Sequence, residues 1–419
     1  MSSKSFIPPK LNYPALWFTD FSLPFLMKQI HNIEGVVISE EDKNTLKKFR
    51  KERFLFIANH PSRKEPPVCY AIANLMNTRF TYMASREIFD EASGLVGTYI
   101  QSIGAFSVLA GANDRESLKM AREILRSPEG HLVLFPEGEP NGWLNDTMIP
   151  FQPGVSQLGF WGLEDAVKDD PSAKLYVLSA FIKYRMSDRK EVLQRDVDES
   201  LRKMEAKLGI SRAGKTVSHR ILSVGKRILE REEKNWGIAA DPDKEDFDFR
   251  IGRIRHTLLD TVAEKLIVPN WNKEDNAIDK LRRLLSSLET VLVGNSIKGM
   301  DHVDKELAKW ARKVCAKAYD YIALKTTYLT ELPSAERIYE WIYRFEKELF
   351  GEYKERPHKA HVNLCAPILM NDWLPSYKSN KKETVTKFTE FLREILESKL
   401  QAEIAKSETL FPNDHIFAE

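Results

Sequence analysis

Hydrophobic and polar positions follow two alternating patterns between residues 54 and 185. A buried strand is a short continuous apolar run, whereas a helix repeats its apolar residues every three or four positions. The predicted strands are Phe54–Ala58, Thr81–Ala84, Ala105–Leu109, Leu132–Phe135 and Leu175–Ile182, and the predicted helices are Pro66–Leu75, Glu87–Ala92, Asp114–Arg126 and Val155–Val167. This alternation indicates the α/β class, with a mixed, largely parallel sheet flanked by helices.

The second half of the chain is dominated by helical periodicity. The predicted helices there are Val192–Leu208, Val217–Asn235, Phe249–Leu266, Lys273–Val293, Met300–Leu324 and Ser334–Phe350. A strand-like run over 360–369 and an amphipathic helix over 381–396 follow them. The pattern favours a large all-helical insertion after which the sheet resumes, because insertion at a surface loop is well tolerated. A separate C-terminal helical region is the alternative.

These pattern changes give a domain organisation along the 419 residues. We expect an N-terminal helical segment over 1–48 and an α/β core over 49–186. The helical insertion covers 187–355, a strand and a helix over 356–405 complete the core, and 406–419 form a tail.

The segment with the most chemistry begins at the end of the first core strand. Its sequence is Asn59-His60-Pro-Ser-Arg-Lys-Glu65-Pro-Pro. Glu65 is close enough in sequence to hydrogen-bond the His60 ring, and the two prolines are compatible with the first turn of a helix. An imidazole held in one tautomer by a carboxylate is the minimum equipment of a general base. Taken alone, the pattern also fits a loop histidine beside a capping glutamate.

Three further blocks follow in order. They are Ile103-Gly-Ala-Phe-Ser-Val108, then Phe135-Pro-Glu137-Gly138, then Pro150-Phe-Gln-Pro-Gly154 with the strand after it. With the histidine block, they make the chain resemble the glycerolipid acyltransferase family, the group that includes 1-acylglycerol-3-phosphate acyltransferases. The resemblance covers roughly residues 50–185.

The resemblance implies an enzyme that moves a fatty acyl group from an acyl thioester to a hydroxyl of a lyso-lipid acceptor. The thioester would be a co-substrate on coenzyme A or acyl carrier protein, and no other cofactor or metal is expected. His60 and Glu65 would be catalytic. The expected substrate-binding residues are Asn59, Arg115, Glu137 and Gly138, with Arg63 and Lys64 as weaker candidates for a phosphate contact. Asn59 is also expected to orient the histidine loop.

The chain departs from the family pattern at three positions. Glu65 stands where the family usually has Asp, Ala110 where an Arg is expected in the second block, and Pro140 where the third block carries an Arg. Because an Arg fork binds phosphate in a way that other residues do not reproduce, a phosphate-free acceptor is an alternative. A non-catalytic lipid-binding protein on the same fold is the other.

Composition places the protein among soluble globular chains. The formal net charge of +2 gives no general attraction to nucleic acid. Three scattered cysteines, without a CxxC pair, indicate reduced thiols, and the histidines lack metal-type spacing. We find no apolar run of membrane-spanning length and no signal-peptide core, so a cytoplasmic protein is expected. The aromatic-rich segment over 13–28 could either pack on the core or lie on a membrane surface, which predicts peripheral association.

Overall fold

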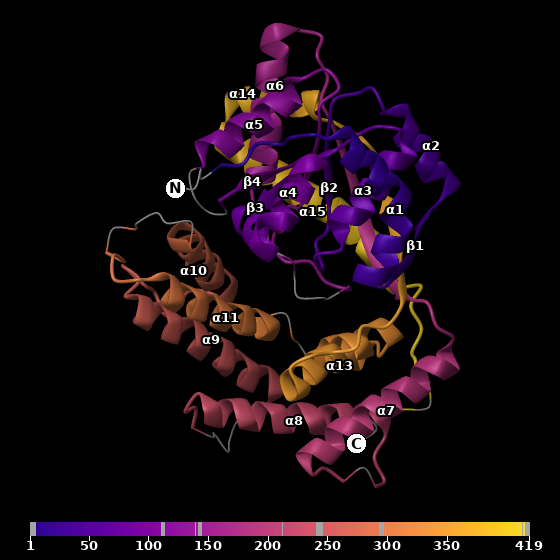
Figure 1. Cartoon of the computed structure of the whole chain (residues 1–419), viewed down its shortest axis with the longest axis vertical. Helices are drawn as coiled ribbons and strands as arrows, with labels where there is room; N and C mark the ends of the chain where they lie inside the picture. Colours follow the sequence, from indigo (N-terminus) through magenta and orange to yellow (C-terminus); the bar gives the residue numbers. More distant parts are fainter. Residues whose placement is uncertain are drawn as a thin grey trace. The chain divides into compact units, whose positions relative to one another are not determined.

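The computed structural model describes residues 6–109, 114–138, 140, 145–211, 213–239, 246–292, 297, 299–322, 324, 326–412 and 414 (Figure 1). These residues group into two compact units. The first unit covers 1–141, 146–185 and 359–405, and the second covers 142–145, 186–358 and 406–419.

Within the described residues, eight strands form one mixed sheet, in the order β1-β7-β6-β2-β5-β3-β4, with the short β8 paired to β6. The strands are β1 Ile33–Ile38, β2 Phe54–Ala58, β3 Thr81–Ser85, β4 Ala105–Val108, β5 His131–Leu134, β6 Tyr176–Met186, β7 His358–Leu364 and β8 Ile368–Leu369. β2 lies between β5 and β6 and is parallel to both, and β3 is parallel to β4 and β5. The predicted α/β class with a largely parallel sheet is therefore confirmed.

Helices cover both faces of this sheet. The helical elements of the first unit are α1 Tyr13–His31, α2 Glu40–Lys48, α3 Glu65–Leu75, η1 Arg86–Gly94, α4 Leu95–Ser102, α5 Arg115–Arg126, α6 Gly154–Asp169, η2 Met370–Trp373, α14 Leu374–Ser379 and α15 Lys381–Ile404. Buried residues of α1 and α3 share a core with Phe54, Phe56 and Ala58 of β2. The other face of β2, with Leu55 and Ile57, packs against α5, α6 and α15. Figure 1 shows α5, α6 and α14 together, away from α1 and α3.

The second unit is helical through most of its described length. Its helices are α7 Lys190–Leu208, α8 Val217–Asn235, α9 Phe247–Leu266, α10 Ala277–Leu292, α11 Lys305–Ile322, α12 Thr326–Glu331 and α13 Ala335–Phe350. They bury a hydrophobic core of their own. The chain leaves the sheet after β6, forms these helices, and returns to the sheet at β7. β6 and β7 are neighbours in the sheet. We interpret the helical segment as an insertion between them.

Two local differences from the predicted elements have physical causes. The segment expected to be helical through residue 48 also contains β1, an edge strand whose six residues bury only Ile33 and Ile38. The helix expected over 87–92 is the 3₁₀ helix η1, which Ala92 and Ser93 interrupt with φ of 48° and 57°. Positive φ is incompatible with a right-handed helix.

The cysteines Cys69, Cys315 and Cys365 are free thiols, and all three are buried.

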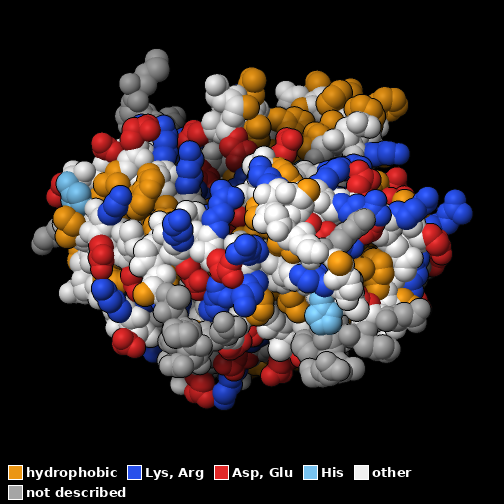
Figure 2. All heavy atoms as spheres, turned by 90° about the horizontal axis from the view of Figure 1, so that it is seen from below, with side chains coloured by type: hydrophobic (Ala, Val, Ile, Leu, Met, Phe, Trp, Pro, Cys, Tyr) orange, Lys and Arg blue, Asp and Glu red, His pale blue; other side chains and the backbone are white. Residues whose placement is uncertain are grey.

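Figure 2 shows Lys and Arg side chains interspersed with Asp and Glu over the face in view. Among the described residues, no helix has the length and apolar character needed to cross a bilayer.

Candidate active site

The candidate site is built where β2 ends. β2 is fully buried between two parallel neighbours, so the residues after Ala58 emerge at the carboxyl edge of the sheet. The chain then turns through 61–63 and enters α3 at Glu65, with Pro66 and Pro67 in the first turn. Proline is tolerated there because the first amides of a helix have no intrahelical partner. This turn places the Glu65 side chain beside the His60 ring.

His60 and Glu65 form a hydrogen-bonded pair. The His60 Nδ1 lies 2.7 Å from the Glu65 Oε2, and Glu65 is completely buried. The imidazole is 13% exposed and stacks on the Phe135 ring, with centroids 4.3 Å apart and planes 16° apart. An ionised carboxylate accepts hydrogen bonds only, so it selects the tautomer with the proton on Nδ1. Nε2 is then left with its lone pair, and it has no hydrogen-bond partner among the described residues.

Asn59 ties the histidine loop to β6. Its Nδ2 donates to the Ile182 carbonyl at 2.9 Å, and the Ile182 amide donates to its Oδ1 at 2.7 Å. The side chain is 1% exposed, and both of its polar groups face the backbone of β6. This geometry fits the orienting role expected for Asn59, and it occupies both polar groups of the side chain with the Ile182 backbone.

Glu137 joins the histidine loop to the segment after β5. Its Oε1 accepts the His60 backbone amide at 2.6 Å, and its Oε2 accepts the Ile149 amide at 2.9 Å. Complete burial raises the pKa of this carboxyl to about 7, and the two amide hydrogen bonds oppose the shift. The contacts show Glu137 supporting the loop from inside the protein rather than presenting its carboxylate to solvent.

Gly138 makes the turn after Glu137 possible. Its φ of 81° lies in the left-handed region, and a Cβ at this position would clash with the side-chain amide of Gln152. The Gln152 backbone amide donates to the Pro136 carbonyl at 2.7 Å. Glycine is therefore needed for the backbone itself, whatever contact Gly138 makes with a substrate.

The loop that carries His60 is fastened by its own backbone amides. The amides of His60, Ser62 and Lys64 donate to Glu137, Glu65 and the Ser62 hydroxyl, respectively. These three internal hydrogen bonds fix the backbone of the loop. The His60 ring is consequently held in place from both ends.

The basic residues expected near a phosphate lie in three different settings. Arg115 is the first residue of α5 and is exposed. It follows β4, which is separated from β2 by β5 and β3, or about 14 Å at the usual strand spacing. Arg63 pairs with Glu91 at 3.0 Å, and Lys64 is 3% exposed. The structure therefore does not bring Arg115 together with His60. Ala110 lies outside the described residues.

Three residues near His60 were not found from sequence. Tyr184 and Ser62 donate hydrogen bonds to Glu65, at 2.7 and 2.8 Å. Lys183, the neighbour of Tyr184 on β6, is completely buried in an ion pair with Asp146, in the segment that Glu137 also holds. A charged residue inside an apolar strand, as in Ile182-Lys183-Tyr184, is the signal that could have marked this position.

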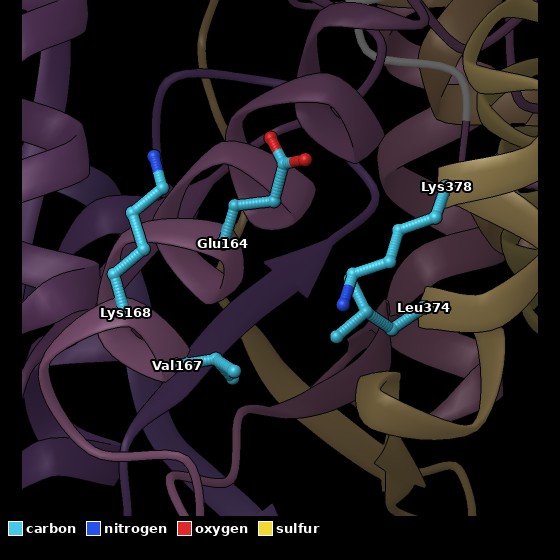
Figure 3. Close-up of a pocket in the computed structure, with 5 residues that line it drawn as sticks. All are labelled: Glu164, Val167, Lys168, Leu374 and Lys378. Carbon is cyan, nitrogen blue, oxygen red and sulfur yellow. The ribbon is translucent and has the colours of Figure 1, made fainter.

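A cavity of about 170 Å³ lies elsewhere in the same unit (Figure 3). It is lined by Glu164, Val167 and Lys168 of α6 and by Leu374 and Lys378 of α14. Typical ligand pockets hold roughly 300–1,000 Å³, so this cavity is smaller than a usual ligand site. Among the described residues, no group of three or more His, Cys, Asp or Glu is arranged to hold a metal ion.

A histidine hydrogen-bonded to a buried carboxylate at the carboxyl edge of a parallel sheet has the arrangement that a general base requires. The sequence model of the family described as Acyltransferase matches residues 37–159, which include all six predicted site residues. Residues 37–159 thus carry an acyltransferase-family domain, and the protein is an acyltransferase. Neither the curated proteins nor the solved structures gave a match.

Proposed function

We propose that the protein transfers a fatty acyl group from an acyl thioester to a hydroxyl of a glycerolipid acceptor such as lysophosphatidate, a reaction of phospholipid synthesis. The donor is acyl-coenzyme A or acyl carrier protein. The observation that carries the proposal is the 2.7 Å contact between His60 Nδ1 and Glu65, which leaves Nε2 as the base. The match to the acyltransferase family over residues 37–159 supports acyl transfer, and the donor and acceptor proposed here are those implied by the resemblance to glycerolipid acyltransferases.

The proposed step is a direct displacement at the thioester carbonyl. His60 Nε2 takes the proton of the acceptor hydroxyl as the oxygen attacks the carbonyl carbon. The new ester C–O bond forms, and the C–S bond then breaks. The imidazolium returns its proton to the departing thiolate, which leaves as the free thiol. Glu65 stabilises the imidazolium between these transfers, as the carboxylate does in hydrolase triads.

The basic residues of this unit bear on whether the acceptor carries a phosphate. Pro140 stands where the family has an Arg, and Arg63 is paired with Glu91. Arg115 remains our candidate, because it follows β4 at the carboxyl edge that also carries His60. These observations keep acyl transfer to a phosphate-free lyso-lipid as the second candidate function.

Thiol release from palmitoyl-coenzyme A by the full chain tests the proposal. Lysophosphatidate, glycerol 3-phosphate and phosphate-free lysolipids serve as acceptors, and acyl carrier protein as an alternative donor. We expect acceptor-dependent release, and a preference for the phosphate-bearing acceptors that Arg115→Ala reduces. A preference for phosphate-free acceptors would support the second candidate. A folded protein without release from any donor would contradict acyl transfer.

The surface of α1 fits a membrane. Its buried residues Leu16, Thr19, Leu23 and Met27 face the core. The opposite side bears exposed aromatic residues at four-residue intervals, namely Tyr13 (72% exposed), Trp17 (69%), Phe21 (91%) and Phe25 (65%). One face of α1 thus packs on the core, and the opposite face is available for a membrane surface. Figure 2 shows one dense group of hydrophobic side chains at its upper right edge.

We propose that this aromatic face of α1 holds the protein on the membrane that contains its lipid substrates, from the cytoplasmic side. Trp, Tyr and Phe are favoured in the interfacial region of a bilayer. Leu95, at the start of α4, adds a further side chain that is 74% exposed, and Thr19 of α1 hydrogen-bonds Tyr99 of α4 at 2.9 Å. The two helices therefore present apolar side chains from adjoining positions.

The double variant Phe21→Glu/Phe25→Glu is expected to bind lipid vesicles at least tenfold more weakly than the wild type. Burying one Phe contributes about 1.5–3 kcal/mol, and two charges at the same depth add a desolvation cost. Co-sedimentation with phosphatidylcholine–phosphatidylglycerol vesicles measures the change. Ile267→Glu is the matched control, because Ile267 is 64% exposed on the helical unit. Equal binding by the double variant and the wild type would contradict the assignment.

A further inference from the structure

The Glu65 carboxylate accepts four hydrogen bonds, two on each oxygen. Oε2 accepts from the His60 ring at 2.7 Å and from the Ser62 backbone amide at 3.2 Å. Oε1 accepts from the Ser62 hydroxyl at 2.8 Å and from the Tyr184 hydroxyl at 2.7 Å. A carboxylate offers about four lone-pair positions, so these donors fill it. Glu65 is completely buried, and the donors replace the water that it lost on folding.

Two of the four bonds come from Ser62 and follow from the tight turn before α3. The Tyr184 bond is different, because it joins residues 119 positions apart. The β2–β6 pairing ends at Ala58 and Ala180, and β6 continues to Met186. Tyr184 therefore lies in the part of β6 that runs on beside the histidine loop. Its side chain is on the face of β6 that packs toward α1 and α3.

The register of this contact is fixed by Asn59. Its two hydrogen bonds to the Ile182 backbone set the position of β6 along the loop, two residues before Tyr184. Tyr184 is 8% exposed and packs in the same core as Val68 and Ile72 of α3. The hydroxyl thus reaches Glu65 from a rigid strand rather than from a loop.

We propose that Tyr184 is a positioning residue of the His60–Glu65 pair, a role that rests on the acyl transfer proposed above. Its hydroxyl holds Oε1 from β6, so that Oε2 stays directed at the His60 Nδ1. Glutamate has three side-chain torsions, and without Tyr184 its carboxylate would be held only by His60 and by Ser62 of its own turn, so its orientation toward the ring would be less tightly fixed. Tyr184 is expected to act on the reaction only through Glu65.

The electrostatic setting keeps Tyr184 a donor. Burial, together with the Glu65 charge, raises the pKa of its hydroxyl well above the usual value, so the phenol stays protonated. The Lys64 ammonium lies over its ring, 5.8 Å from the centroid. Other titratable groups that interact with Glu65 or Tyr184 include His60, His31 at the end of α1, Cys69 of α3 and Glu137 after β5.

Tyr184→Phe removes the hydroxyl and keeps the ring. We expect kcat to fall about tenfold and the KM for both substrates to stay within about twofold, because a hydrogen bond to a charged group is lost away from the substrates. The Nδ1 proton of His60, followed by NMR in protein labelled with ¹⁵N-histidine, is expected to shift and to exchange faster with water. Tyr377→Phe is the matched control, since Tyr377 is also buried and accepts a 2.7 Å bond from Gln157.

The two readouts separate this inference from the proposed function. A wild type without thiol release would overturn acyl transfer, and with it the role of Tyr184 in turnover, whereas the NMR measurement would still report whether the hydroxyl holds the pair. An active wild type with unchanged kcat or an unchanged His60 resonance in Tyr184→Phe would overturn only the positioning role. If Tyr184→Phe does not fold, 3-fluorotyrosine at position 184 keeps the hydroxyl and changes its strength as a donor to Oε1, and the His60 Nδ1 resonance is expected to shift. An unshifted resonance would overturn the inference.

Discussion

His60→Ala is expected to lower kcat for acceptor-dependent thiol release by about 10³-fold. General base catalysis contributes roughly 10²–10⁴, and Nε2 of His60 is the base available on the ring that Glu65 holds. The ring is 13% exposed, so its removal leaves a small cavity beside Phe135 and the fold should persist. Single-turnover measurement of thiol release, at saturating donor and acceptor, reports the chemical step without product release.

His219→Ala provides the matched control for that measurement. His219 is exposed on α8 of the helical unit and contacts Thr216, at 2.8 Å. Its replacement is expected to leave the rate unchanged. Retention of more than about a tenth of the wild-type rate in His60→Ala would assign the base to another group. A circular dichroism spectrum like that of the wild type would show that the variant is folded.

The periodicity of the sequence predicted the elements that pack most completely. β2 is fully buried on both faces, and the predicted range Phe54–Ala58 is the observed one. Helix α5 begins one residue after the predicted Asp114, which is its N-cap and accepts the Ser117 amide. β1 was missed because an edge strand buries little, so its alternation is weak in the sequence. The sequence pattern therefore predicted best the elements in which each position is either clearly buried or clearly exposed.

In the candidate site, the sequence predicted the contact between residues close together in the chain and missed the contact between residues far apart. The five-residue spacing from His60 to Glu65 predicts their hydrogen bond, because a short turn joins them. Tyr184 comes from a strand 119 residues further on, and no local pattern connects it to Glu65. Tertiary pairing of β2 with β6 brings the two together. The sequence predicted that Asn59 and Glu137 belong to the site. Their hydrogen bonds to the backbone of Ile182 and His60 depend on the fold and could not be predicted from the sequence.

Glu137→Ala is expected to destabilise the site locally by about 2–6 kcal/mol, because it leaves two buried amides without their partner. Its carboxylate accepts the backbone amides of His60 and Ile149, and a buried amide without a partner costs about 1–3 kcal/mol. Hydrogen exchange of peptides that contain these two amides, followed by mass spectrometry, measures the loss as faster exchange. Thiol release should fall in parallel, because the His60 backbone is no longer anchored. Unchanged exchange at both amides would show that the loop is held by other contacts.

The same carboxylate sets the direction of a pH dependence. Burial raises the Glu137 pKa from 4.5 to about 7, so the folded state binds more protons than the unfolded state between these values. The stabilisation from this group is therefore complete below pH 4.5 and is lost as the pH rises through 7, by about 3 kcal/mol at most. Protection of the His60 and Ile149 amides, corrected for intrinsic exchange rates, should accordingly be greater at pH 6 than at pH 8. In Glu137→Gln, which does not titrate, the difference between the two pH values should disappear, and a difference that persisted would place its origin in another group.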